Sequence, residues 1–313
     1  MTTTDRSERL DGGSIVWAAA LLIVAALCWA GNYIAGRAIA GHVPPAGLAV
    51  GRWLVAVLLL VPLAWPHLRR DLGVMAPRWR YMLLMGVLGA GVFGTLQYAA
   101  LQYTTATNGG LISASSPVMI ALAGALMFGD RLLPRQIAGL ALSMTGAVVI
   151  AAKGDWANLA ALRLDVGDLM ILATLVSWGI YCALLRHKPM VHWASFTLGL
   201  FAVALVGNIP LAAFEHVSGR PLLATLPTAL AVLYTGVISS VIGFLAWNRG
   251  VEIIGAARAG VFLNLIPIFT VLLAVLLLGE TIRTFHFVAC ALVFSGLWLA
   301  TTARAPGGRA VGS

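Results

Sequence analysis

The sequence predicts an all-α integral membrane protein of ten transmembrane helices, arranged as two inverted five-helix repeats around a central cavity. Three observations predict this fold class. The chain of 313 residues is 60% hydrophobic and only 10% charged, whereas soluble domains carry roughly 25% charged residues. Apolar runs of about 20 residues, enough to cross a ~30 Å hydrocarbon core as helices, follow one another along the chain. One long stretch also occurs twice.

The repeated stretch is residues 106–146, which returns without a gap as residues 256–296. Pro117 matches Pro267, so the period is 150 residues (267 − 117 = 150), close to half of the chain. Each copy is an apolar run with one central proline, a Gly–acid turn and a second apolar run, so each predicts a transmembrane hairpin. Because each half holds five spans, an odd number, the second half must enter the membrane upside down.

The first and sixth spans extend this match. ALCWAGNYIAGRA in the first span is similar to LVSWGIYCALLRH in the sixth. Together with the turn of the hairpin, they give three matched pairs: Trp29 with Trp178, Arg37 with Arg186, and Asp130 with Glu280. We therefore expect a first repeat over residues 14–152 and a second, inverted repeat over residues 166–303.

Prolines mark several ends of the predicted spans. Pro44–Pro45 opens the second span, Pro62 and Pro66 are expected to close it, and Pro134 opens the fifth, as suits proline in a first helical turn. The ten predicted cores are 15–36, 46–64, 80–101, 108–128, 135–152, 167–186, 194–213, 228–248, 258–278 and 285–303.

Lysine and arginine predict the orientation. With the N-terminus inside, the cytoplasmic segments hold 14 of the 20 basic residues and the other side holds 6, a bias that places both termini in the cytoplasm. The same bias explains the formal charge of +9 without nucleic acid as a partner. The first apolar run is too long for a signal peptide and has a counterpart in the second half, so we interpret it as a retained span.

Polar and aromatic side chains inside the spans predict the site, because such groups normally face a cavity or a partner in a membrane. They gather in spans one, three, four, six, eight and nine, which we place around the cavity, with the other spans outside. The predicted substrate-binding residues are Trp29, Asn32, Tyr33, Gln97, Tyr98, Ser116, Trp178, Tyr181, Trp247, Asn248 and Asn264. The alternatives are hydroxyls bonded to their own helix and aromatic rings that only pack or sit at the membrane interface.

Pro117 and Pro267 are the predicted hinges. Each removes a helical hydrogen bond in mid-span and frees a carbonyl, that of Ser113 and that of Leu263. These carbonyls could accept from a substrate amine beside Ser116 and Asn264. The alternative is a packing kink without a ligand.

Arg52 is the unusual charge, since it lies roughly 9 Å inside the second span. It either extends to the outer surface or pairs with a substrate carboxylate, and Arg37 leaves the same two alternatives. No Asp or Glu lies in mid-span: Asp130, Asp168, Glu252 and Glu280 lie near span ends, where they suit helix caps. His286 is interpreted as a packing residue.

Several motifs are absent. The sequence has no HExxH, GxSxG, Walker A or CxxC motif, which excludes an ATP-driven pump within this chain and predicts neither an enzyme, nor a metal site, nor a cofactor. Its three cysteines lie inside apolar runs and are interpreted as small core residues.

The W-A-G-N-Y segment with its following arginine, the ATNGGLISASSPV run, the GD and GE turns and the late glycines of spans five and ten resemble the EamA type of the drug/metabolite transporter superfamily. The resemblance covers roughly residues 14–303, although Asp130 stands where the family usually has glutamate. Within the family, the chain is most similar to the YddG-type exporters of aromatic and other amino acids. The resemblance implies a ten-helix basket with alternating access, in a bacterial cytoplasmic membrane.

The leading functional hypothesis is a secondary transporter that exports small organic solutes, amino acids above all, from within a lipid bilayer. The alternatives are an EamA-type transporter of another metabolite or drug, and an integral-membrane enzyme acting on a lipid-borne substrate. A homodimer is left open.

Overall fold

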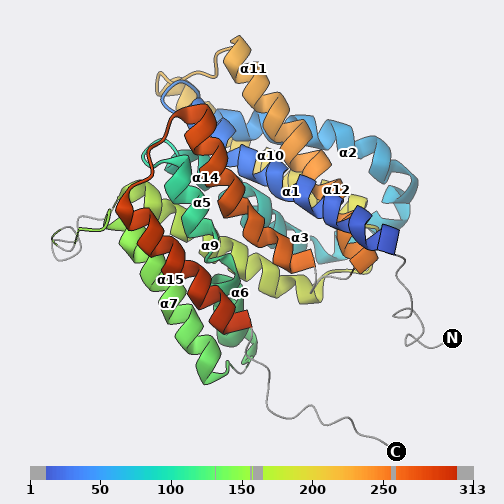
Figure 1. Ribbon diagram of the computed structural model, residues 1–313. Helices are drawn as coiled ribbons and strands as arrows, with labels where there is room; N and C mark the ends of the chain where they lie inside the picture. Colours follow the sequence, from blue (N-terminus) through green and yellow to red (C-terminus); the bar gives the residue numbers. More distant parts are fainter. Residues whose placement is uncertain (1–11, 131, 156, 158–164, 255–258, 302–313) are drawn as a thin grey trace, which may run out of the picture.

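The computed structural model describes residues 12–130, 132–155, 157, 165–254 and 259–301, and every regular element within them is helical (Figure 1). The first half contains α1 (Gly12–Ala38), α2 (Pro45–Met75), α3 (Trp79–Gly86), the π-helical η2 (Val87–Val92), α4 (Phe93–Ala100), α5 (Ala106–Ser113), α6 (Ser116–Phe128) and α7 (Pro134–Ala151). The second half contains α9 (Val166–Leu184), α10 (Trp193–Val217), α11 (Leu226–Leu233), the π-helical η4 (Tyr234–Ile242), α12 (Gly243–Ile254), the 3₁₀ turn η5 (Gly260–Asn264), α14 (Leu265–Leu278) and α15 (Thr284–Thr301). The start predicted for the ninth span, residue 258, lies outside the described residues.

Among the described residues, six helical segments are long and apolar enough to cross a membrane, or seven if α5 and α6, bent by 44°, form one span. The segment Pro45–Ala100 has 56 residues, about 84 Å of helix against a ~30 Å hydrocarbon core. It folds back on itself, because a Cβ at Gly94 of α4 would lie 3.1 Å from the ring of Trp53 on α2. This segment is therefore long enough to cross the membrane twice, as the sequence predicts.

The proline predictions have two outcomes. Pro45 begins α2 behind Pro44, and Pro134 begins α7, as expected. The prediction that Pro62 and Pro66 end the second span is wrong, because α2 continues through both to Met75. Neighbouring groups and small backbone adjustments can satisfy the carbonyls that an internal proline frees in a membrane helix.

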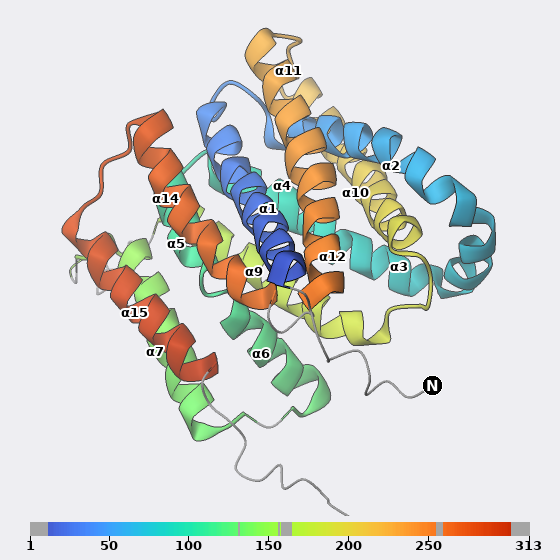
Figure 2. The same cartoon turned by 45° about the vertical axis from the view of Figure 1, so that its right-hand side comes forward.

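The helices pack in matched pairs. α1 lies between α12 and α14 (Figure 2), and α9 packs against α4 and α6. α2 packs along α10, and α7 packs along α15 at one edge of the molecule (Figure 1). Under the sequence match of the two halves, the α1–α12 contact corresponds to the α9–α4 contact, and α1–α14 corresponds to α9–α6.

Glycines 150 residues apart let the backbones of α7 and α15 touch. A Cβ on Gly296 would lie 2.5 Å from the carbonyl oxygen of Gly139, and a Cβ on Gly146 would lie 2.9 Å from that of Ala289. Close backbone approach at small residues is a common way for membrane helices to associate, since lipid provides no hydrophobic drive between them. The late glycines of spans five and ten thus have a packing role.

Candidate functional site

A buried arginine is the centre of the polar side chains. Arg52 is only 6% exposed. Its Nε donates to Ser240 Oγ at 2.8 Å, and its Nη1 donates to Tyr98 OH at 2.7 Å and to Asn32 Oδ1 at 3.3 Å. Its guanidinium also lies 4.3 Å from the centre of the Trp53 ring, within the range of a cation–π contact. Four elements, α1, α2, α4 and η4, therefore meet at one charge.

The interpretation that Arg52 extends to the surface is consequently wrong. The second span was also expected to lie outside the central group, yet its Arg52 reaches the first, third and eighth spans. The polar partners inside the bundle satisfy the guanidinium where lipid could not.

Two further hydrogen bonds complete what we call the polar cluster, made of Asn32, Arg52, Gln97, Tyr98 and Ser240. Tyr98 OH donates to Asn32 Oδ1 at 2.8 Å, and Asn32 Nδ2 donates to Gln97 Oε1 at 3.4 Å. Three of the predicted site residues are thus in direct contact. Ser240 is not among the residues predicted from the sequence, and Arg52 is predicted only as an alternative, although a charge within a span is a signal for a site.

The π-helical segment η4 presents Ser240 to Arg52. Ser240 Oγ donates to the carbonyl of Thr235, five residues earlier, at 2.8 Å, so the hydroxyl is oriented to accept from the guanidinium. π-Helical turns are rare and frequently occur at functional sites. The neighbouring Ser239 Oγ is buried and has no hydrogen-bond partner among the described residues.

The predicted aromatic residues form two separate groups. Trp29 lies 5.6 Å from Trp247, centroid to centroid, and its Nε1 donates to the carbonyl of Ser239 at 3.2 Å. Trp178 lies 5.0 Å from Tyr181 and 5.0 Å from Phe93, spacings typical of favourable aromatic pairs.

Among the described residues, no hydrogen bond or ring contact joins Tyr33, Asn248 or Asn264 to these groups. Tyr33 is buried beside Gly109. Asn248 and Asn264 are half-buried and make no side-chain hydrogen bond to a described residue.

The predicted hinges begin helices after a break. Pro117 lies in the first turn of α6, behind the break at residues 114–115, and Pro267 lies in the first turn of α14 behind η5. The carbonyl of Ser113 that Pro117 was expected to leave free accepts from Ser116 Oγ. A hydroxyl three residues later, across the break, therefore satisfies this carbonyl, in line with the alternative that hydroxyls bond to nearby backbone.

A second buried cluster, made of Thr104, Asn108, Asp168 and His286, was not expected. Asp168 is fully buried in the first turn of α9, and it accepts from Thr104 Oγ1 and from Asn108 Nδ2, the latter at 3.1 Å. His286 Nε2 lies 3.0 Å from Asn108 Oδ1, and its Nδ1 accepts from the backbone N–H of Arg283. Asp168 is therefore no simple helix cap, and His286 does more than pack. The capping role belongs to Asp165, which accepts from the N–H of Gly167 at 2.9 Å.

The matched charged residues sit at two ends of the molecule. At what we call the Arg186 end, Arg186 donates to both carboxylate oxygens of Asp130, at 2.7 and 3.3 Å. At the Arg37 end, the equivalent residues do not form an ion pair. Arg37 donates to the carbonyl of Leu101 at 2.9 Å, and Glu280 accepts the backbone N–H groups of Ala106 and Thr107 at 2.8 and 2.9 Å.

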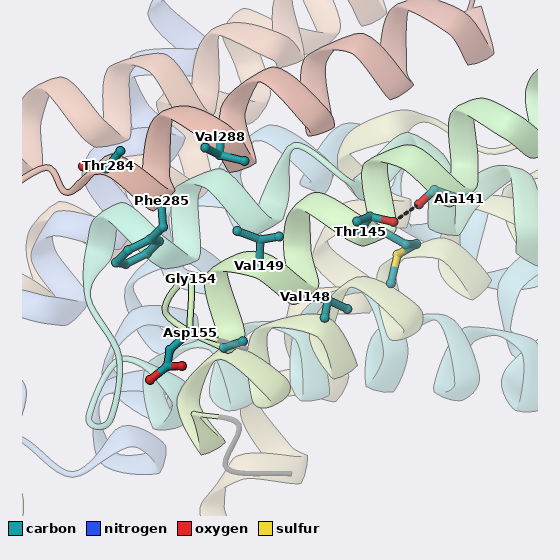
Figure 3. A pocket seen from close by; sticks show the side chains of 11 residues that line it. Ala141, Thr145, Val148, Val149, Gly154, Asp155, Thr284, Phe285 and Val288 are labelled. Carbon is teal, nitrogen blue, oxygen red and sulfur yellow. Dashed lines mark hydrogen bonds between the residues drawn. The ribbon is translucent and has the colours of Figure 1, made fainter. Parts of the chain in front are cut away.

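A cavity of about 310 Å³ lies beside Arg37 and Glu280 at the Arg37 end. Its lining is Arg37, Ala38, Ala40, Thr105, Leu278 and Glu280. A larger, mainly apolar cavity of about 530 Å³ lies between α7 and α15 (Figure 3). There Phe285 points towards Gly154 and Asp155, and Thr145 bonds its own helix at the carbonyl of Ala141. None of the predicted site residues lines either cavity. The described residues also contain no group of three His, Cys, Asp or Glu side chains able to hold a metal ion.

Comparison with known proteins identifies the family. The model of the EamA-like transporter family matches residues 16–152 and again residues 165–302. An uncharacterized transporter of Archaeoglobus fulgidus is 30% identical over 90% of this chain and 96% of its own length.

Two further relatives carry more specific names. A probable terminal-alkyne amino-acid exporter of Streptantibioticus cattleyicolor is 30% identical over 91% of this chain and 92% of its own. A probable amino-acid metabolite efflux pump of Salmonella typhimurium is 24% identical over 90% and 92%.

One solved crystal structure shares the fold with a TM-score of 0.56, at 22% identity, over 91% of this chain and 96% of the other. The family model covers nearly the whole chain in two successive matches, one for each half. The chain belongs to the EamA-like transporter family and is an EamA-type transporter of small solutes.

Proposed function

We propose that the chain is a secondary transporter that exports small organic solutes, amino acids above all, by alternating access. In this proposal residues 14–152 and 166–303 are inverted five-helix repeats, giving ten spans. Both termini lie in the cytoplasm of a bacterial inner membrane. The Arg186 end is then cytoplasmic and the Arg37 end external.

One observation carries the proposal: equivalent charged residues adopt two arrangements at opposite ends of the same molecule. Arg186 contacts Asp130 at 2.7 Å, whereas a cavity of about 310 Å³ lies beside Arg37 and Glu280. Two inverted copies that exchange these arrangements would open one end as they close the other, which is the motion expected of inverted-repeat transporters. In the described state the cytoplasmic end would be closed.

The choice of amino acids has support from the relatives and from the chemistry of the site. Two relatives are named for the export of amino acids or their metabolites. The polar cluster offers hydrogen-bonding groups, and the rings of Trp29, Trp178 and Tyr181 offer faces for an apolar side chain. The similarity to YddG-type exporters of aromatic amino acids remains a prediction.

Transport by the purified protein tests the proposal. Proteoliposomes that contain only this protein should exchange at least one radiolabelled amino acid out of a panel of all twenty, above empty liposomes. Failure of every amino acid, with uptake of another metabolite, would overturn the substrate. Failure of all solutes with folded protein would overturn the transport function.

Matched variants test the site in the same assay. Tyr98→Leu and Asn264→Leu should reduce transport two- to tenfold for each hydrogen bond lost, with expression unchanged. Thr145→Val, on the exposed side of α7, should not reduce it. Ser143 is a poor control, because it is fully buried and donates to Ser115 Oγ.

A further inference from the structure

We infer that Arg52 binds the carboxylate of the transported solute, a role that rests on the proposed transport function. The substrates would then be small organic carboxylates, and a neutral derivative of the same molecule would not be recognised.

Arg52 has no acidic partner among the described residues. Of the 11 acidic residues, three precede residue 12 and eight are described (11 − 3 = 8). Four of the eight contact a basic side chain: Asp71 with Arg70, Asp130 with Arg186, Asp165 with Lys153, and Glu252 with Arg249. The other four contact neutral donors: Asp155, Asp168, Glu215 and Glu280. No described carboxylate is thus available to the guanidinium.

All the recorded partners of Arg52 are neutral. Ser240, Tyr98 and Asn32 satisfy hydrogen bonds, but they leave the full positive charge in a membrane interior, where charge is costly. An anion would remove the cost, and the charge thereby favours anionic solutes.

The geometry of the guanidinium suits a carboxylate. Nε and Nη1 have partners, whereas Nη2 has none among the described residues. A carboxylate that displaces Asn32 Oδ1 could accept from Nη1 and Nη2 together, the two-bond arrangement that makes arginine selective for planar anions. The Tyr98 hydroxyl, released from Asn32 Oδ1 at the same time, would then donate to a remaining lone pair of the carboxylate.

The cavity at the Arg37 end lies on the same helix, α1, as Asn32 of the polar cluster. Arg37, which lines the cavity, lies on the same helix as Asn32, about 7.5 Å further along at 1.5 Å per residue. Arg37 also bonds to Leu101, which directly follows α4, the helix that carries Tyr98. A solute that entered at this end would thus meet Arg37 about one and a half helical turns from Asn32.

The second half has no equivalent charge. The residues that match Arg52 on α10 are apolar, Leu200 to Ala202, and the ring of Phe201 packs against Trp53 at 4.6 Å. The site thus offers one cationic anchor beside apolar and aromatic surface. This arrangement fits a solute with a single carboxylate and an apolar remainder.

The test compares each carboxylate with its own carboxamide. Full-length protein in detergent is titrated with the twenty L-amino acids, with simple monocarboxylates such as benzoate, and with the carboxamide of each. We expect the carboxylates that bind to do so at least tenfold more tightly than their carboxamides. Equal binding of the two forms, or binding of neutral and cationic compounds alone, would overturn the inference.

Variants show whether Arg52 sets this ratio. Arg52→Gln should remove the preference for carboxylates, and Arg52→Lys should retain part of it, because lysine keeps the charge but loses the two-bond geometry. Thr145→Val, on the exposed side of α7 and outside the polar cluster, is the control and should keep the preference. If Arg52→Gln does not fold, the ratio of Arg52→Lys decides, and an unchanged ratio in Arg52→Lys would contradict the inference.

Transport separates this inference from the proposed function. Transport of a solute without a carboxylate, equal in the wild type and in Arg52→Gln, would refute the anchor and leave the transporter standing. Arg52-dependent binding of carboxylates without transport of any solute would refute the transport function alone.

Discussion

The two ends of the molecule carry the same pair of charges in different arrangements. An arginine lies near the end of the first span of each half, and an acid follows the glycine of each hairpin turn. At the Arg186 end the two side chains meet at 2.7 Å. At the Arg37 end, Arg37 and Glu280 each form hydrogen bonds with backbone groups and not with one another. A cavity of about 310 Å³ lies beside both.

The difference shows that one set of residues can be satisfied in two ways. The ion pair replaces the bonds to the backbone at one end, and the backbone bonds replace the ion pair at the other. Because exposed ion pairs add little stability and the separated groups keep hydrogen bonds, neither arrangement is strongly preferred. A small difference of this kind is what a transporter needs if substrate binding is to shift its equilibrium.

Locking the Arg186 end should have the largest effect. In a background with Cys28, Cys182 and Cys290 replaced by alanine, Asp130→Cys and Arg186→Cys would be joined by a short bismaleimide. Transport should be lost, because the closed end could no longer open. Each single cysteine treated with the same reagent should keep at least half of its activity, and full transport by the cross-linked protein would contradict the comparison.

Breaking the ion pair should have a smaller effect. Arg186→Ala removes the partner of Asp130, so the Arg186 end should open more often, by up to about fivefold, the range expected for an exposed pair. The measurement is the labelling rate of a cysteine placed at the buried Ala183. Arg37→Ala is the matched control at the other end and should leave that rate unchanged. The reversed pair, Asp130→Arg with Arg186→Asp, should restore it, and failure to do so would mean that the charges are not what closes this end.

Removing the acid at each end should affect stability differently. Glu280→Gln weakens a cap on the first N–H groups of α5 and should cost about 1 kcal/mol, or about 1–2 °C in the melting temperature of a chain of this size. Asp130→Asn removes only an exposed partner and should change the melting temperature less. A scan of both variants in detergent checks this, and a larger loss for Asp130→Asn would reverse the assignment of roles.

The pH dependence should be the smallest effect. The hydrogen bond from Arg186 holds the pKa of Asp130 below its ordinary value of 3.8. A depressed carboxyl pKa favours the paired state above the ordinary value, and this contribution is lost as the pH falls through the depressed pKa. The labelling rate of Ala183→Cys should therefore be constant between about pH 5 and 8. Each rate is first divided by the rate at which the same reagent labels the same thiol in denaturant at that pH. A step within that range would indicate that another group closes the Arg186 end.

Features that depend on local composition and on repetition could be predicted from the sequence. Apolar runs, Pro45 and Pro134 predicted the spans and two of their ends, because the transfer of side chains into lipid and the missing N–H of proline act wherever the residue lies. The repeat also matched Arg37 to Arg186 and Asp130 to Glu280, although it gave no indication of which pair would be in contact.

The hydrogen-bond partners of the buried polar side chains depend on tertiary packing. Arg52 and Ser240 are 188 residues apart, and His286 and Asn108 are 178 apart, so no local pattern could join them. Pro62 looked like the end of a span, yet α2 continues past it because the membrane-buried backbone adjusts to its surroundings. The hydrophobic pattern of a sequence indicates which residues prefer lipid or water. The partners of a buried charge depend on which helices pack around it.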